Sequence, residues 1–316
     1  MCKNIHNIRK GFTLVELLIV ITIIGILASL AAVGVNAVRR TAAQASIKTQ
    51  MSEISAALET YKSNYSEYPP SLADRNATMR HVSNRWMRAG GLKYKDVLYA
   101  AGVSQGDIDE LIDANDLITE SLKNDPRWGL IHMVSLRFWL SGPYDATRGK
   151  SLGFAADLSN PLNLTASQRQ DPIYPLDEKK VFEMNAKNGI LYGMNIRNEP
   201  IVYFRGSKSA GYGSAADLAT IAKVDLGDSG VAIPYAKNLI LNDDGSIREI
   251  VWYENDKFQL VHPGLDKKFS GTRASVLVWF TGQSDVEGVS NGITSADLDN
   301  ATNFTDTATL DSLVKQ

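Results

Sequence analysis

The sequence predicts an α+β protein in which a long N-terminal helix packs on an antiparallel sheet, with mostly helical segments inserted between them. Residues 12–35 form an almost unbroken apolar run, an apolar stripe of helical spacing follows it, and short β-rich runs appear after residue 180. The chain has 316 residues, 44% hydrophobic and 22% charged. This composition is ordinary for a foldable protein and sufficient for one or two packed domains.

The first element is the apolar run, which contains a single charge, Glu16. At ~1.5 Å per residue a helix over 12–35 would be roughly 36 Å long, enough to cross a hydrocarbon core of ~30 Å. A secretory signal peptide explains the preceding basic residues, but its apolar core is shorter. A plain membrane anchor explains the length but not the carboxylate, which is costly in lipid unless it has a partner.

The stretch "KGFTLVELLIVITIIGILASL" resembles the N-terminal signal of type IV pilins and of the pseudopilins of type II secretion systems. The resemblance implies that a prepilin peptidase removes residues 1–11 by cutting between Gly11 and Phe12, and then methylates the new amine of Phe12. Glu16 becomes the fifth residue of the processed chain, where this family keeps a glutamate. Its carboxylate is expected to pair with the amine of a neighbouring subunit during filament assembly.

The same resemblance implies the location and the partners of the protein. The precursor is expected in the bacterial inner membrane as a single-pass protein with its head in the periplasm, and later in a periplasmic or extracellular filament. Its partners are copies of itself or other pilin-like subunits, the prepilin peptidase, and an inner-membrane assembly platform with its ATPase. The fold is expected to be pilin-like.

The second half of the helix, 36–65, is predicted to be an amphipathic spine. Apolar residues recur there at steps of four and three, namely Ile47, Met51, Ile54, Leu58, Tyr61, Tyr65 and Tyr68. This spacing fits a two-stranded coiled coil or a helix packed along its own globular domain. Because Pro69 and Pro70 end the pattern, the second alternative is favoured.

The head is expected to span 66–316 and to change character along the chain. Residues 71–141 are predicted to be mainly helical, most clearly 104–122, where Ser104 is a candidate cap. Residues 180–316 are predicted to be β-rich, and 206–216 is expected to be a loop. The predicted strands are 199–205, 237–241, 247–254 and 273–280, with "NDDGS" as the turn between the second and third.

The stretch 278–304 resembles the C-terminal loop of major pseudopilins, which binds one calcium ion. The resemblance implies that Asp285 takes the first acidic position and that Asp297 and Asp299 take the later ones. Calcium accepts 6–8 oxygen ligands, so three carboxylates with backbone carbonyls would suffice. A solvated glycine-rich surface loop remains the alternative.

Other functional classes find little support in the composition. The net charge of −2 gives no reason to expect a nucleic-acid partner. A single cysteine, Cys2, excludes an intramolecular disulfide, and the four histidines form no zinc-ligand pattern. Local motifs of hydrolases and phosphate-binding loops are absent, so no enzymatic activity is expected.

The sequence therefore predicts a structural subunit of a type II secretion pseudopilus or a type IV pilus-like filament. Retention of Glu16 favours the filament body. A low-copy minor subunit, or a role of the unmatched middle region in adhesion or DNA uptake, stays open. The alternative is a single-pass anchored or secreted protein whose head is a binding module or a hydrolase.

Overall fold

The computed structural model describes residues 12–122, 125–176, 178–207, 212, 223–269, 299–305 and 309–310, without the side chains of 30–34, 178 and 228. The chain divides into two compact units, 1–43 and 44–316, the second of which is referred to below as the head. Helix α1 (Leu14–Tyr65) contributes to both. The predicted leader, 1–11, lies outside the described residues.

In the first unit the described chain is helical from Leu14 onward, and the side chains of residues 12–29 are exposed. They include twelve large apolar side chains, each at least 44% exposed, from Phe12 to Leu27. Within the described residues, no helix is both long and apolar enough to cross a membrane.

In the head, α1 buries the predicted apolar stripe. Ile47, Met51, Ile54, Leu58 and Tyr61 are each at most 2% exposed and belong to the main core. The helix therefore packs along its own domain, as predicted. It ends at Tyr65, before the prolines, because Ser66 adopts φ 63° and donates its N–H to the Lys62 carbonyl, a left-handed helix end.

Four further α-helices follow α1: α2 (Arg75–Arg85), α3 (Tyr94–Ala100), α4 (Gln105–Leu111) and α5 (Arg127–Ser141). The predicted helix over 104–122 is too long. Ser104 does cap α4 by accepting the Asp107 N–H, but α4 ends at Leu111. Asp113 then accepts the N–H groups of Asn115 and Leu117, a turn that competes with helix. A short 3₁₀ helix, η1 (Glu120–Leu122), completes the segment.

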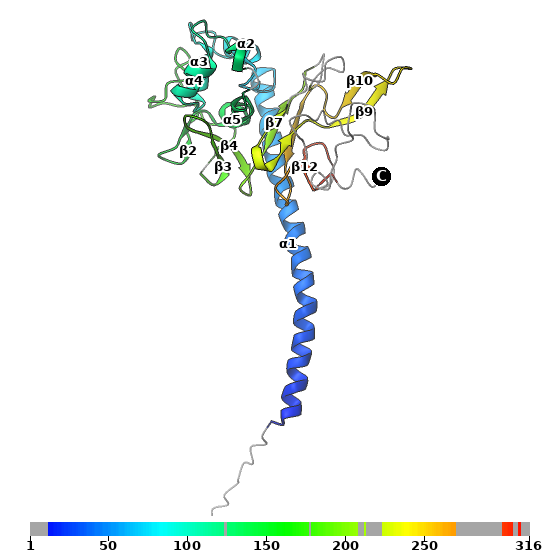
Figure 1. Ribbon diagram of the computed structural model, residues 1–316. Helices are drawn as coiled ribbons and strands as arrows, with labels where there is room; N and C mark the ends of the chain where they lie inside the picture. The colour runs from blue at the N-terminus through cyan, green and yellow to red at the C-terminus, as the bar shows by residue number, and fades with distance from the viewer. Residues whose placement is uncertain are drawn as a thin grey trace, which may run out of the picture. The chain divides into compact units, whose positions relative to one another are not determined.

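The strands of the described residues form several small antiparallel sheets (Figure 1). Two sheets have three strands: β3 (Val181–Asn185), β4 (Ile190–Ile196) and β5 (Glu199–Pro200); and β6 (Val202–Arg205), β11 (Phe258–His262) and β12 (Ala301–Thr302). Three are pairs: β1 (Tyr144–Asp145) with β2 (Lys150–Ser151), β7 (Val224–Asp225) with β8 (Val231–Ala232), and β9 (Ala236–Leu241) with β10 (Ile247–Trp252). The chain is α+β, as predicted.

The predicted strands agree with these sheets to different degrees. The hairpin of β9 and β10 forms around the predicted turn, in which Gly245 takes φ 83°. The predicted strand 199–205 is divided at Ile201 between two sheets. The predicted strand 273–280, and most of the predicted loop 206–216, lie outside the described residues.

A buried guanidinium connects three elements of the head. Arg137 on α5 is fully buried and donates to three backbone carbonyls: Tyr192 on β4, Ala101 after α3, and Gly142 after α5, at 2.7, 2.6 and 2.9 Å. Burial lowers the pKa of Arg137 to about 10, which still leaves it charged at neutral pH. Each of the three guanidinium nitrogens donates one hydrogen bond to a carbonyl, which offsets part of the cost of burying this charge.

A second arginine begins α5. Arg127 forms a two-bond pair with Asp125, at 2.9 and 2.8 Å, and also bonds Asp107 and Glu110 of α4 at 2.7 and 2.9 Å. Lys187, in the β3–β4 turn, binds the same Glu110 at 2.9 Å. This network attaches α4 to the start of α5 and to the hairpin.

The C-terminal described segment packs against the beginning of the head. β12 pairs with β11, and the Lys48 ammonium of α1 donates to the carbonyls of Thr302 and Thr305. These contacts join residues more than 250 positions apart in the chain.

A third polar cluster lies where α1, α2 and β6 meet. The Tyr61 hydroxyl bonds His81 Nε2, His81 Nδ1 bonds Glu67 at 2.7 Å, and Glu67 pairs with Arg205 at 2.7 Å. Arg85 donates to the Tyr61 hydroxyl at 3.1 Å. Burial lowers the pKa of His81 below its ordinary value, so the imidazole is neutral at pH 7 and Nδ1 donates to the carboxylate.

Replacing Arg137 by lysine should destabilise the head, because one ammonium cannot reach three carbonyls that diverge in space. The expected loss is about 3 kcal/mol in the free energy of unfolding, measured by urea titration of tryptophan fluorescence. Arg148→Lys is the control, since its side chain is 70% exposed, and should change the same quantity by less than about 0.5 kcal/mol. Equal urea midpoints for Arg137→Lys and Arg148→Lys would contradict the stabilising role of the Arg137 hydrogen bonds.

Acidification should destabilise the head in two steps. The folded-state pKa of His81 lies below the unfolded value, so the unfolded chain binds more protons and stability falls as pH drops from about 6.5. The His81 and Arg205 bonds lower the pKa of Glu67 to about 2, so a further loss follows below about pH 4.5. Urea midpoints at pH 7.5, 6.0 and 5.0 measure the first step.

His81→Gln should flatten the dependence between pH 7.5 and 5.0, because it removes one of the titrating groups. His132 and His262, whose pKa values burial also lowers, remain in that variant and keep part of the slope. An unchanged slope would contradict the assignment to His81.

Candidate N-terminal processing and assembly site

The polar residues at the start of α1 form a reciprocal cap. Thr13 precedes the helix, and its N–H and hydroxyl both donate to Glu16 Oε2 at 2.8 Å. The Glu16 N–H in turn donates to Thr13 Oγ1 at 3.2 Å. This is a capping box, in which side chains satisfy backbone donors that have no partner within the helix.

The cap places the carboxylate beside the backbone of Thr13, one residue from Phe12. The expected partner of Glu16 was an amine of another subunit, and Thr13 is a further, local partner that was not predicted. The Thr-x-x-Glu spacing of residues 13–16 was the available signal. The structure thus brings Glu16 to the residue that follows Phe12, while Gly11 lies outside the described residues.

The surface around this cap is apolar. Phe12 is 79% and Leu14 82% exposed, and the apolar exposure continues along α1 to Leu27. A contiguous apolar surface of this kind marks an interaction with lipid or with other protein, because isolated exposed apolar residues do not produce it.

The predicted calcium ligands are only partly described. Asp285 and Asp297 lie outside the described residues. Asp299 follows them, and its Oδ2 accepts the N–H groups of Leu265 and Asp266 at 2.7 and 3.1 Å. Its Oδ1 is buried and, among the described residues, has no hydrogen-bond partner. An acceptor of this kind fits a cation ligand. Among the described residues no three acidic, His or Cys side chains form a metal-binding group.

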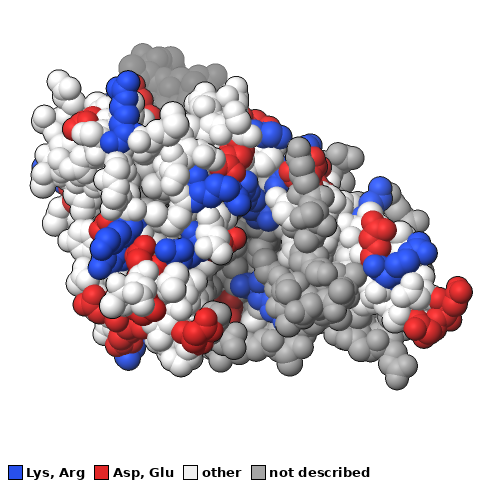
Figure 2. All heavy atoms as spheres, turned by 90° about the horizontal axis from the view of Figure 1, so that it is seen from above, with Lys and Arg blue, Asp and Glu red and all other residues white. Residues whose placement is uncertain are grey.

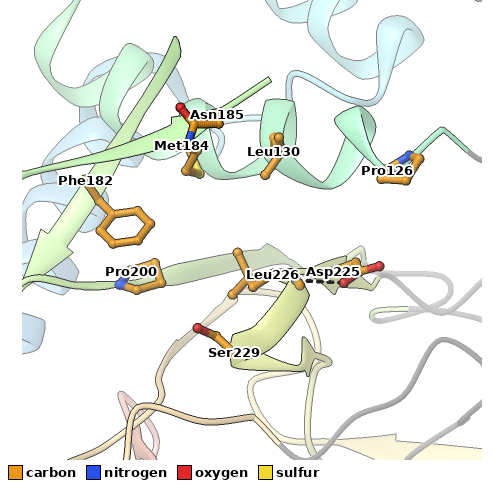
Figure 3. A pocket seen from close by; sticks show the side chains of 10 residues that line it. Pro126, Leu130, Phe182, Met184, Asn185, Pro200, Asp225, Leu226 and Ser229 are labelled. Atoms are coloured by element: carbon orange, nitrogen blue, oxygen red, sulfur yellow. Dashed lines mark hydrogen bonds between the residues drawn. The ribbon is translucent and has the colours of Figure 1, made fainter. Parts of the chain in front are cut away.

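A cleft of about 320 Å³ lies between α5, the β3–β5 sheet and η4 (Gly227–Ser229) (Figure 3). Six of its ten lining residues are apolar or proline: Pro126, Leu130, Phe182, Met184, Pro200 and Leu226. Among the described lining residues Asp225 is the titratable one, and its carboxylate accepts the Gly227 N–H at 3.0 Å. The described lining therefore contains no pair of titratable groups of the kind that acid–base catalysis uses.

Charged side chains of both signs are interspersed on the face seen in Figure 2. Among the described residues, Arg75 pairs with Asp116 and Arg205 with Glu67. This distribution agrees with the small net charge of the whole chain.

Thr13→Ala should loosen the start of α1, since it removes the side-chain half of the cap. A lost cap costs about 1 kcal/mol, so amide hydrogen exchange at residues 14–17 should accelerate about fivefold. Thr22→Ala is the matched control, because Thr22 donates to the Leu18 carbonyl within the helix and caps nothing. Equal exchange at 14–17 in the two variants would contradict the capping role.

Comparison with known proteins gives one match. The family model described as the prokaryotic N-terminal methylation motif matches residues 6–32. No curated protein and no solved structure matches the chain. The matched residues include the Gly11–Phe12 junction, Thr13, Glu16 and most of the exposed apolar surface. The chain therefore carries, at its N-terminus, the methylation signal of type IV pilins and pseudopilins.

Proposed function

We propose that this protein is a structural subunit of a pilus-like filament, either a type II secretion pseudopilus or a type IV pilus-like fibre. The observation that carries the proposal is the methylation motif at 6–32, in which a carboxylate caps the start of a helix with an exposed apolar surface. Polymerisation is its activity, and no enzymatic activity is proposed.

Processing and assembly use the residues of the cap. Prepilin peptidase cuts between Gly11 and Phe12, which leaves a new amine on Phe12, and this amine is methylated. Glu16 lies one helical turn away, with its Oε2 already bonded to the Thr13 N–H and hydroxyl. In the filament its carboxylate pairs with the Phe12 amine of a neighbouring subunit, which sets the axial register.

Before assembly the exposed apolar surface of α1 is held in the bacterial inner membrane, and in the filament other subunits cover it. The assembly platform and its ATPase extract each subunit from the membrane. The filament itself is periplasmic or extracellular. The alternative is a single-pass or secreted protein with a binding or hydrolytic head, in which case the N-terminus would be intact or cut elsewhere.

The N-terminal peptide of the membrane-extracted protein tests the proposal by mass spectrometry. Phe12 with the added mass of one methyl group is the expected terminus. An intact leader, or a terminus near Ala32, would overturn the processing and with it the filament.

Glu16→Ala should leave a processed, membrane-resident subunit that does not enter filaments, because the incoming amine finds no carboxylate. The readout is the fraction of subunit in sheared filaments, with the N-terminal peptide measured in the same sample. Glu249→Ala is the control, since that glutamate is exposed on β10 of the head. Normal filaments from Glu16→Ala would contradict the assembly role without affecting the processing result.

We also propose that Asp299, with Asp285 and Asp297, holds a calcium ion. The buried Asp299 Oδ1 supports this, since a bound cation would satisfy it. Calcium would attach the segment around Asp297 to the loop at Leu265, whose N–H already bonds Asp299.

Chelation with EGTA should lower the Tm of the full-length protein in detergent by about 5 °C, because a ligand that binds only the folded state stabilises it. Asp299→Asn should remove the calcium effect, and Asp256→Asn, an exposed control, should keep it. A Tm that is insensitive to EGTA would identify the segment as an ordinary surface loop.

A further inference from the structure

A second pocket of the head, of about 510 Å³, lies between α3, α4 and the loop at 160–164. Its volume falls in the range of small-ligand sites, ~300–1,000 Å³. Figure 1 shows α3 and α4 side by side in the head. Neither the methylation motif nor the proposed calcium site involves this pocket.

The pocket has an apolar base and an aromatic wall. Ala100, Ile108 and Leu162 line it and are each at most 8% exposed, so they form its buried part. Tyr99 also lines it and is 53% exposed, so its side chain is accessible to a ligand in the pocket. An exposed tyrosine ring presents a π-face to a ligand that can stack C–H groups on it.

Hydrogen-bonding side chains also line the pocket. Asp96 and Tyr99 are three residues apart on α3 and therefore share a face. Gln105 lies at the start of α4, and Asn160 comes from the loop. Among the described residues the Asn160 amide and the Tyr99 hydroxyl make no hydrogen bond to protein.

The remaining polar groups are only partly used. Asp96 Oδ2 accepts the Lys93 N–H, and Gln105 Nε2 donates to Asp109, which leaves the Asp96 Oδ1 and Gln105 Oε1 acceptors. The pocket thus offers amide donors, amide and carboxylate acceptors and a hydroxyl together with one aromatic face.

A sugar ring matches this set of groups. Its hydroxyls both donate and accept hydrogen bonds, and its C–H face stacks on an aromatic ring. Among the described lining residues there is one cation, Lys95, and one anion, Asp96, at adjacent positions, so this lining favours no net ligand charge. An anionic ligand would meet the Asp96 carboxylate, and a cationic ligand the Lys95 ammonium.

We propose that the pocket of Tyr99, Asp96, Gln105 and Asn160 binds a neutral carbohydrate. The head would then carry a glycan-binding surface in addition to any role in a filament. Because the pocket residues belong to the head alone, this inference does not depend on N-terminal processing.

The test is a glycan array with neutral, acidic and amino glycans, probed with the full-length protein in LDAO, a detergent without sugar. Binding to neutral glycans is expected. Tyr99→Ala and Asn160→Ala should each reduce the apparent affinity by about tenfold, the loss of one stacking or hydrogen-bonding group. Tyr99→Phe keeps the ring and should retain most of the binding.

Asn76→Ala is the matched control, because Asn76 is an exposed amide on α2 and does not line the pocket. Urea midpoints equal to that of the unmodified protein establish that the variants fold. Binding confined to acidic or amino glycans, equal binding by Tyr99→Ala, or no glycan binding would each overturn the proposal.

Discussion

The head depends on a buried positive charge, that of Arg137, which backbone carbonyls surround. Removing a guanidinium from water costs several kcal/mol, and Arg137 offsets part of this cost through three carbonyl groups held in place around it and through the Tyr144 ring, whose centroid lies 5.7 Å from the guanidinium carbon. Those carbonyls belong to β4, to the turn after α3 and to the end of α5. The orientation of α5 is therefore coupled to the sheet and to the small helices. The position of α3, which presents Tyr99, follows from the same contact.

The start of α1 shows how one carboxylate can serve two states of a protein. In the single chain the Glu16 carboxylate accepts hydrogen bonds from the Thr13 N–H and hydroxyl, so its charge already has local hydrogen-bond partners. A neighbouring amine would have to compete with this cap. The free energy that Glu16 would contribute to an assembly is consequently that of its pair with the amine minus that of the cap with Thr13. The cap and the proposed filament contact would use the same side chain, that of Glu16.

The sequence predicts the parts of this protein that repeat with a period or match a local pattern. The stripe from Ile47 to Tyr61 has helical spacing, and it is buried as expected. Helix α4 was expected to continue beyond Leu111 because the apolar spacing continues. It does not, because the Asp113 side chain accepts hydrogen bonds from the N–H groups of Asn115 and Leu117, which form a turn instead. The contacts of Arg127 with α4, and of Arg137 with β4 and Ala101, could not be predicted, since these groups lie 17 to 55 residues from their arginine and become its neighbours only in the folded chain. The Thr13–Glu16 cap was not predicted, although the Thr-x-x-Glu spacing of residues 13–16 is a local signal for it.

The contact of Lys48 with Thr302 and Thr305 has a consequence for folding. Loop closure over more than 250 residues is slow compared with the formation of local helices. The core beside Lys48 is therefore complete only after the segment at 299–305 has folded against α1. A partly folded head differs from a fully folded one by the exposure of that surface.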